Sequence, residues 1–333
     1  MVSKYQLVKA NIGVFLIVAI LALSFVSVFA ADVQNTPSTR VVVGNASPTV
    51  ASVVLNGGSA IVLTANVTTS FNISYQISDA NGCADINTNT AGTSTAYRSG
   101  VSATCAIESP TTSSLSCYSY ITRVTSSCSG TTINVTDTVD IFYFAESTDA
   151  TGEFPSQTWA ATAFARDLAA ATGSAASASI ELNTLVGIRI TTTTINYNNG
   201  TAMSASSTTG TTDNTTPYHT ATTTNVGNVS TTYSIRTSGT LTSGANSVAT
   251  SNQRWATSTY NYDTESPSAN GPTSTQLTGS NVNVTDHILI HATTTAGPGA
   301  SSTRRTFWGL KVPAGSVNAT YTGTNVYTGA IAP

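Results

Sequence analysis

The stretch Ser70-Phe-Asn-Ile-Ser-Tyr-Gln-Ile77 alternates polar and apolar side chains over its whole length. Successive side chains of a β-strand point to opposite faces, so a strand here places Phe71, Ile73, Tyr75 and Ile77 on one face. The pattern therefore predicts a half-buried strand. The turn signal Asp79-Ala-Asn-Gly82 follows it directly.

Similar β-favouring runs separated by turn clusters occur on both sides of this stretch. Within residues 46–182 they lie at 49–55, 60–63, 139–145, 157–165 and 176–182. Together they predict about seven strands, the size of an immunoglobulin-like β-sandwich, with Trp159 as the expected core aromatic. Residues 167–176 are rich in alanine, but Gly173 favours a loop between strands over a helix.

A new series of alternating runs starts after residue 183, where we place a domain boundary. The runs lie at 187–191, 230–236, 281–285, 286–290, 305–312 and 318–322. They predict a second β-sandwich over residues 184–333, in which the Thr/Ser/Gly-rich stretches 198–224 and 263–279 are loops or glycan-bearing surface. The predicted fold class is all-β, with two immunoglobulin-like β-sandwiches in tandem.

The composition narrows the function. The chain has 333 residues, only 8% of them charged, and its formal net charge is −3. A nucleic-acid-binding protein needs a dense basic face, so this composition argues against that class and against a long charged coiled coil. The only lysines are Lys4, Lys9 and Lys311.

The N-terminus reads as an export signal. Lys4 and Lys9 precede an almost wholly apolar run from Ile12 to Phe29, and Val28-Phe29-Ala30 offers small residues at the spacing of a cleavage site. We expect a signal peptide over residues 1–30, cleaved after Ala30 or, as the second choice, after Ala31. The run is about 18 residues long, so an uncleaved membrane anchor is the alternative. Residues 31–45 form a polar linker.

All four cysteines lie in the first predicted sandwich: Cys83, Cys105, Cys117 and Cys128. An even, clustered set in an exported chain predicts two disulfides, for which three connectivities exist. We favour Cys105–Cys117 together with Cys83–Cys128. Because the chain has no Cys-x-x-Cys pair and no histidine in this window, a metal site on these cysteines is the weaker reading.

Two stretches near the end of the chain, Phe307-Trp-Gly-Leu-Lys-Val-Pro-Ala-Gly-Ser316 and Tyr321-Thr-Gly-Thr-Asn-Val326, are similar to known sequences. They resemble the closing strands of β-sandwiches in secreted surface proteins of unknown function from small-genome uncultivated bacteria and archaea. The resemblance extends over most of residues 46–333 and implies the fold, but no activity. Further segments that fit it are Ser47-Pro-Thr-Val50, Ile77-Ser-Asp-Ala-Asn-Gly-Cys83, Thr224-Asn-Val-Gly-Asn228 and Ser251-Asn-Gln-Arg-Trp255.

Among inorganic sites, a calcium site is the better candidate in this sequence. Asp79, Asn81 and Asp85 lie within one short glycine-containing turn, and oxygen ligands at this spacing suit a hard cation. No bidentate glutamate follows, so an Asx-turn that closes a hairpin is the competing interpretation. Additional acidic residues could contribute from a neighbouring loop or could be solvated turn residues: Asp137, Asp140, Asp149 and Glu153.

His287 and His291 have the spacing of a zinc pair on a helix, but their neighbours favour a strand. On a strand these residues lie about 13 Å apart, too far to share one ion. We therefore expect two polar strand residues near a sheet edge.

The chain offers no constellation that predicts catalysis. It contains no Gly-x-Ser-x-Gly motif and no glycine-rich phosphate loop. Trp255, Tyr260 and Tyr262 could form an aromatic platform for sugar rings, or they could be core residues.

We expect a non-enzymatic secreted or cell-surface protein with a structural or adhesive role. A carbohydrate-binding module on the cell envelope is the alternative. The expected partners are cell-envelope or surface polymers, other copies of the chain, or glycans of a host or neighbour. We expect no nucleic acid partner, no cofactor apart from the calcium candidate, and membrane attachment only through an uncleaved N-terminal segment.

Overall fold

The computed structural model describes residues 38–87, 93–103, 115–192, 194–200, 202–205, 219–263, 274–294 and 296–333. Residues 1–44 and 45–333 form two separate units. The predicted signal segment lies outside the described residues. In the part of the chain that is described, no helix is both long and apolar enough to cross a membrane.

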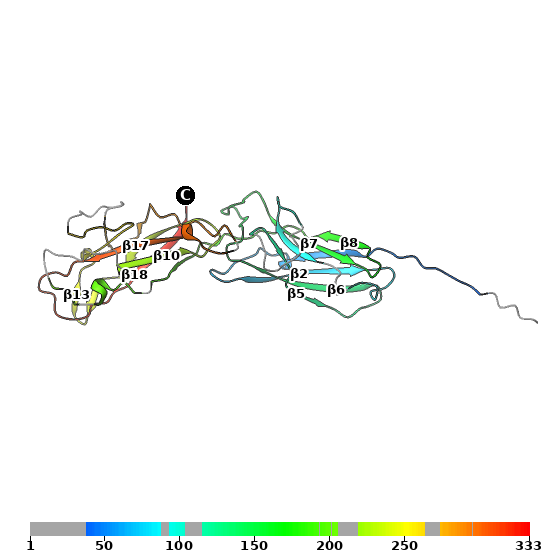
Figure 1. Ribbon diagram of the computed structural model, residues 1–333, viewed down its shortest axis with the longest axis horizontal. Coiled ribbons are helices and arrows are strands. Elements are labelled where there is room, and N and C mark those ends of the chain that lie inside the picture. The colour runs from blue at the N-terminus through cyan, green and yellow to red at the C-terminus, as the bar shows by residue number, and fades with distance from the viewer. Residues whose placement is uncertain are drawn as a thin grey trace, which may run out of the picture. The chain divides into compact units, whose positions relative to one another are not determined.

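Residues 45–182 contain two four-stranded antiparallel sheets (Figure 1). The first has the order β1-β2-β6-β5 and comprises β1 (Thr49–Leu55), β2 (Thr69–Ser78), β6 (Thr132–Ile141) and β5 (Thr122–Thr125). The second has the order β4-β3-β7-β8 and comprises β4 (Cys117–Ser119), β3 (Ser94–Arg98), β7 (Trp159–Arg166) and β8 (Thr172–Ala176). A short 3-10 helix, η1 (Asn56–Gly58), follows β1.

Strand β2 confirms the prediction from its alternating sequence. It pairs with β6 along its whole length, from Thr69 opposite Ile141 to Ser78 opposite Thr132. Phe71, Ile73, Tyr75 and Ile77 are all buried and belong to the hydrophobic core of this half. The same core contains the fully buried Trp159, which contributes from the other sheet.

Some predicted strands of this half are wrong in their extent. Residues 60–63 contribute only an isolated bridge between Ile61 and Leu182, and β6 begins at Thr132, before the predicted run. Residues 172–176, expected in a loop, form β8. Gly173 fits this strand because the Pro48 carbonyl occupies the space that a Cβ would need.

Residues 187–333 form a further set of antiparallel sheets. The largest has the order β15-β14-β17-β10-β9 and comprises β15 (Thr275–Gln276), β14 (Gln253–Ala256), β17 (Thr303–Leu310), β10 (Thr220–Asn225) and β9 (Ile188–Ile190). A second has the order β16-β11-β18, with β16 (Val282–Asn283), β11 (Thr231–Thr237) and β18 (Asn325–Ile331). Other elements that the structure describes in this half are the hairpin β12 (Leu241–Ser243) and β13 (Asn246–Val248) and the 3-10 helices η2 (Tyr197–Gly200), η4 (Thr250–Asn252) and η5 (Ala300–Ser302).

Strand β10 corrects the end of the stretch 198–224 that was predicted as loop or surface, because the strand begins at Thr220. It pairs with β17 on one side and β9 on the other, and most of its side chains are buried. Its sequence, Thr-Ala-Thr-Thr-Thr-Asn, is polar, but threonine is β-branched and packs well on a pleated surface. A threonine-rich run can therefore form an interior strand.

No sheet among the described strands combines residues from both sides of position 183. The segment at that position is held from both sides, since the Thr184 backbone N–H donates to Asp149 at 2.7 Å and the Leu185 N–H donates to Asn228 at 2.7 Å. A small cluster also packs Tyr143 and Phe144 against Val226 and Ala292. The independence of the two halves stays a prediction.

Candidate functional site

Three carboxylates come together in the first half of the chain: Asp79, Asp85 and Asp167. One oxygen from each of them lies within 4.8 Å of the others. Asp79 directly follows β2 and Asp85 lies in the next turn, whereas Asp167 directly follows β7 of the other sheet. The group therefore brings together the end of a strand from each of the two sheets.

Backbone conformation and backbone hydrogen bonds hold the segment that carries Asp79 and Asp85. Gly82 has a φ of +106°, a conformation that L side chains rarely adopt. The Gly82 N–H donates to the Asp79 carbonyl at 3.1 Å, and the Cys83 N–H donates to the Gly130 carbonyl at 3.1 Å. The disulfide between Cys83 and Cys128, whose Cα atoms are 5.7 Å apart, ties the turn to the segment before β6.

Burial and hydrogen bonding differ among the three carboxylates. Asp79 and Asp167 are each only 1% exposed, and Asp85 is partly exposed. Asp79 Oδ1 accepts the Asn81 N–H at 2.8 Å, but Asp79 Oδ2 is buried without a hydrogen-bond partner. Asp167 accepts the Ala171 N–H at 2.7 Å and the Asn45 Nδ2–H at 2.8 Å.

The sequence predicted part of this group. Asp79 and Asp85 belong to it as expected, whereas the side-chain oxygen of Asn81 accepts the Ala46 N–H at 2.6 Å. The bond from Asn81 N–H to Asp79 is the expected Asx-turn, so the turn and the carboxylate group coexist. Asp167 was missed because it is distant in sequence and only the pairing of the sheets brings it close.

The disulfide prediction is confirmed for one pair. Cys83 and Cys128 are bonded to each other. Cys117 is also disulfide-bonded, and Cys105 lies outside the described residues, so the pair Cys105–Cys117 stays a prediction.

Asp137, considered above as an additional calcium ligand, has a different role. It is fully buried on β6 and accepts hydrogen bonds from Arg123 Nε at 2.6 Å and Nη2 at 2.7 Å. The Tyr75 and Ser94 hydroxyls donate to it at 2.9 and 2.6 Å. Burial, together with the Asp137 charge, raises the pKa of Tyr75 well above its usual range. This is a satisfied ion pair that belongs to the core.

The three aromatic residues considered as a sugar platform are buried in the structure. Trp255 is 2% exposed, and Tyr260 and Tyr262 are each 4% exposed. The tyrosine hydroxyls donate to the backbone carbonyls of Arg254 and Asn252, and the Arg254 guanidinium lies 4.2 Å from the centre of the Tyr262 ring. These side chains therefore offer no exposed face to a sugar ring, and the core interpretation replaces the platform.

His287 and His291 are both buried. This corrects the prediction of two polar strand residues near a sheet edge. His287 Nδ1 lies 2.8 Å from the Tyr233 hydroxyl, and burial, assisted by the Arg304 charge, lowers the pKa of His287. His291 Nε2 lies 3.1 Å from a carboxylate oxygen of Glu153. The two imidazoles thus have separate partners.

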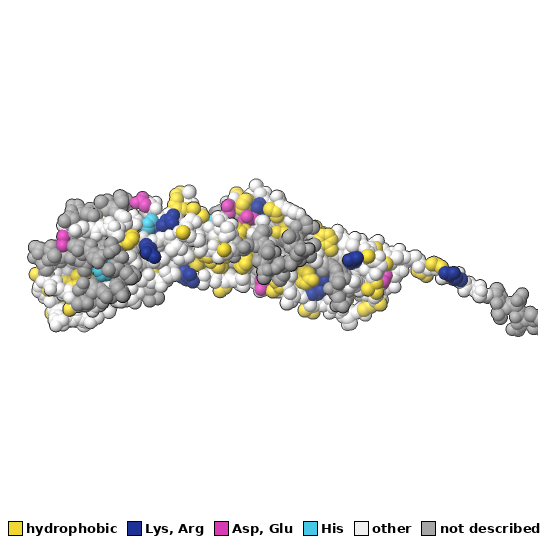
Figure 2. All heavy atoms as spheres, in the orientation of Figure 1, with side chains coloured by type: hydrophobic (Ala, Val, Ile, Leu, Met, Phe, Trp, Pro, Cys, Tyr) yellow, Lys and Arg dark blue, Asp and Glu magenta, His cyan; other side chains and the backbone are white. Residues whose placement is uncertain are grey.

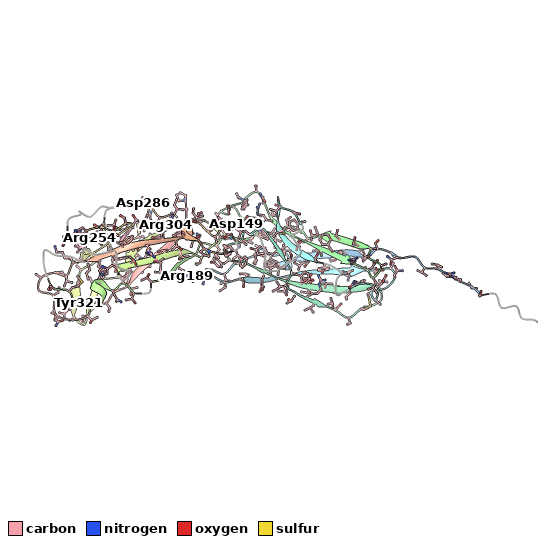
Figure 3. All side chains as sticks on the ribbon, in the orientation of Figure 1. Asp149, Arg189, Arg254, Asp286, Arg304 and Tyr321 are labelled. Atoms are coloured by element: carbon pink, nitrogen blue, oxygen red, sulfur yellow. A yellow bond between two sulfur atoms is a disulfide. The ribbon has the colours of Figure 1, made fainter. Side chains whose placement is uncertain are left out.

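The described charges do not gather in one large patch on the face that Figure 2 shows, where basic and acidic side chains lie scattered among neutral ones. Charged residues placed in different parts of residues 45–333 are labelled in Figure 3, among them Asp149, Arg254 and Asp286. The carboxylate group of Asp79, Asp85 and Asp167 is therefore the strongest candidate site. No protein-family model matches the chain, and no curated protein matches it either.

Proposed function

We propose that this chain is a non-enzymatic secreted or cell-surface protein with a structural or adhesive role. In this proposal, residues 1–30 direct export, 31–45 form a linker, and 46–182 and 184–333 are two immunoglobulin-like β-sandwiches. The partners are cell-envelope polymers, surface glycans or other copies of the chain.

The observation that carries the proposal is the disulfide between Cys83 and Cys128. Structural disulfides persist in oxidising compartments and are rare in the cytosol. This bridge clamps a turn beside β6 within an all-β unit, as expected for a protein whose folded form must persist outside the cell.

The structural use of charged side chains further supports a scaffold role. Arg123 pairs with Asp137 between neighbouring strands, and Arg98 of β3 pairs with Glu146. The Arg98 guanidinium also lies over the Phe154 ring, 3.7 Å from its centre. These groups hold strands and loops together, which is a role in folding rather than in substrate binding.

The test is to locate the protein and its thiols in the source cells. We expect an external protease to cleave it on intact cells, and non-reducing mass spectrometry to find no free thiol. N-terminal sequencing should start at Ala31 or Asp32, whereas an intact Met1 in the membrane fraction would show an anchored form. Four alkylatable cysteines in a protein protected from external protease would contradict the proposal.

A glycan array separates the proposed role from that of a carbohydrate-binding module. A structural protein should be found in isolated envelopes or filaments without affinity for particular glycans. Selective glycan binding, lost when an exposed residue is substituted, would instead identify a carbohydrate-binding module.

A further inference from the structure

We propose that Asp79, Asp85 and Asp167 bind a divalent cation, and that the ion is Ca²⁺. The argument rests on the geometry of these residues and does not depend on the proposed function. The site differs from the one expected from the sequence, because Asp167 of the opposite sheet joins Asp79 and Asp85, whereas the Asn81 side-chain oxygen accepts the Ala46 N–H.

The first argument is the uncompensated negative charge. Three carboxylates converge within 4.8 Å, and two of them are almost completely buried. In the described part of the chain, none of the three forms an ion pair with a basic side chain. Like charges this close repel one another strongly when they are partly removed from water. A bound cation turns this repulsion into attraction.

The second argument is independent and concerns Asp79 alone. Its Oδ1 is engaged by the Asn81 N–H, whereas its Oδ2 is buried and accepts no hydrogen bond. Burying a carboxylate oxygen without a partner is costly, so such atoms in native proteins point to a ligand that completes them. A cation held with Asp85 and Asp167 supplies that partner.

The ligand atoms favour calcium. All three are carboxylate oxygens, which hard cations prefer over softer metals. Mg²⁺ requires near-octahedral geometry with short bonds of about 2.1 Å and keeps most of its waters, whereas Ca²⁺ accepts longer and more variable bonds of about 2.3–2.6 Å. Calcium also tolerates irregular coordination completed by water.

The position of the site indicates what the ion does. Asp79 and Asp85 belong to the turn after β2, which Cys83 ties to Cys128, and Asp167 follows β7 in the other sheet. Asn45, the first residue of this unit, donates to Asp167, and Ala46 donates to Asn81. A cation here links both sheets and secures the start of the unit.

The experiment measures binding of CaCl₂ and, separately, MgCl₂ to the full chain by calorimetry after treatment with a chelator. We expect one saturable calcium site with a dissociation constant of about 10⁻⁴–10⁻³ M, as in extracellular calcium modules. Calcium should also raise the melting temperature, because a ligand that binds only the folded state stabilises it. Asp85→Asn should weaken calcium binding at least about tenfold, since it removes one of three anionic ligands.

Asp286→Asn is the matched control, because it removes an exposed carboxylate elsewhere in the unit and should bind calcium like the original chain (Figure 3). Asp79→Asn alters a buried residue, so the partly exposed Asp85 provides the decisive variant, with circular dichroism confirming its fold. The proposal is overturned if the folded chain shows no saturable calcium binding up to about 10 mM, well above the expected range. Unchanged binding in Asp85→Asn, or tighter binding of magnesium than of calcium, would overturn it equally.

Discussion

The two halves of residues 45–333 are built from similar residues but are stabilised differently. In the first half, β2 and β6 are each ten residues long, and a disulfide and the buried Arg123–Asp137 pair reinforce the sheets. In the second half the longest of the described strands, β17, has eight residues, and the sequence has no cysteine there. A buried amide, Asn225, instead donates to the carbonyls of Val229 and Leu289 and accepts the Gly227 N–H.

The comparison shows that two β-rich halves of similar polar composition can be stabilised by different interactions. Covalent and ionic links carry part of the stability of the first half. In the second half, buried amide and hydroxyl groups such as the Asn225 amide supply hydrogen bonds instead, although Gln253 Nε2 and the Ser274 and Thr275 hydroxyls are buried without a hydrogen-bond partner. The predictions below test this contrast.

The largest expected effect is that of reduction. Residues 46–182 and 184–333 are expressed separately and melted with and without dithiothreitol. The first should lose about 2–5 kcal/mol of stability when its bridges are reduced, and the second should be indifferent, because all cysteines precede residue 183. If residues 184–333 alone are unfolded, or if their melting follows the reductant as strongly, the two-domain prediction is wrong.

The next effect comes from the buried ion pair. Asp137→Asn should destabilise the chain by about 3 kcal/mol, because Arg123, whose side chain is 12% exposed, loses its ionic partner. Denaturant unfolding gives the magnitude, and hydrogen exchange should place the loss in β2, β5 and β6. Asp140→Asn on the same strand is the control and should cost less than about 1 kcal/mol, since its bond to Ser70 is exposed.

Asn225→Ala probes the second half in the same way. It should cost about 2 kcal/mol, because the carbonyls of Val229 and Leu289 and the Gly227 N–H lose a buried partner. Hydrogen exchange should increase in β10 and β11 and remain unchanged in β2. The exposed Asn246→Ala serves as control, and equal losses for the two variants would show that buried amides do not hold this half together.

The smallest effect depends on pH and involves the Glu153–His291 pair. The hydrogen bond from His291 holds the pKa of Glu153 below its ordinary value of 4.5, although burial opposes this. A lowered folded-state pKa stabilises the protein above pH 4.5, and this contribution disappears as the pH falls through the folded pKa. Because the Glu153 side chain is 41% exposed, solvent screening limits the contribution to about 0.5 kcal/mol.

The free energies of unfolding of the Glu153→Gln variant and of the original chain should therefore be equal at low pH and differ slightly at neutral pH. Asp263→Asn, an exposed carboxylate, controls for the loss of one charge. If the free energies of unfolding of the variant and the original chain differ equally at pH 3 and pH 7, the Glu153–His291 pair does not cause the difference.

The alternating stretch at residues 70–77 predicted its strand because every second side chain of a strand points to the same face, so a buried face is visible as a local sequence pattern. The same reasoning succeeded for β1, whose bounds match the predicted run, and for Trp159 as a core residue. It failed for β10, since the threonines of a surface loop and of an interior strand have the same side chains. It left Tyr260 and Tyr262 open between a sugar platform and the core, because their burial depends on a neighbouring strand, β17, that presents Gly309 to them.

By itself, the sequence determined an all-β chain, the buried face of β2 and two members of the carboxylate group, Asp79 and Asp85. These features depend on residues close together in the chain. The tertiary structure alone decided that Asp167 joins that group and that Asp137 is part of an internal ion pair. Both depend on which strands become neighbours, and the burial that sets the chemistry of a carboxylate arises only when distant segments pack around it.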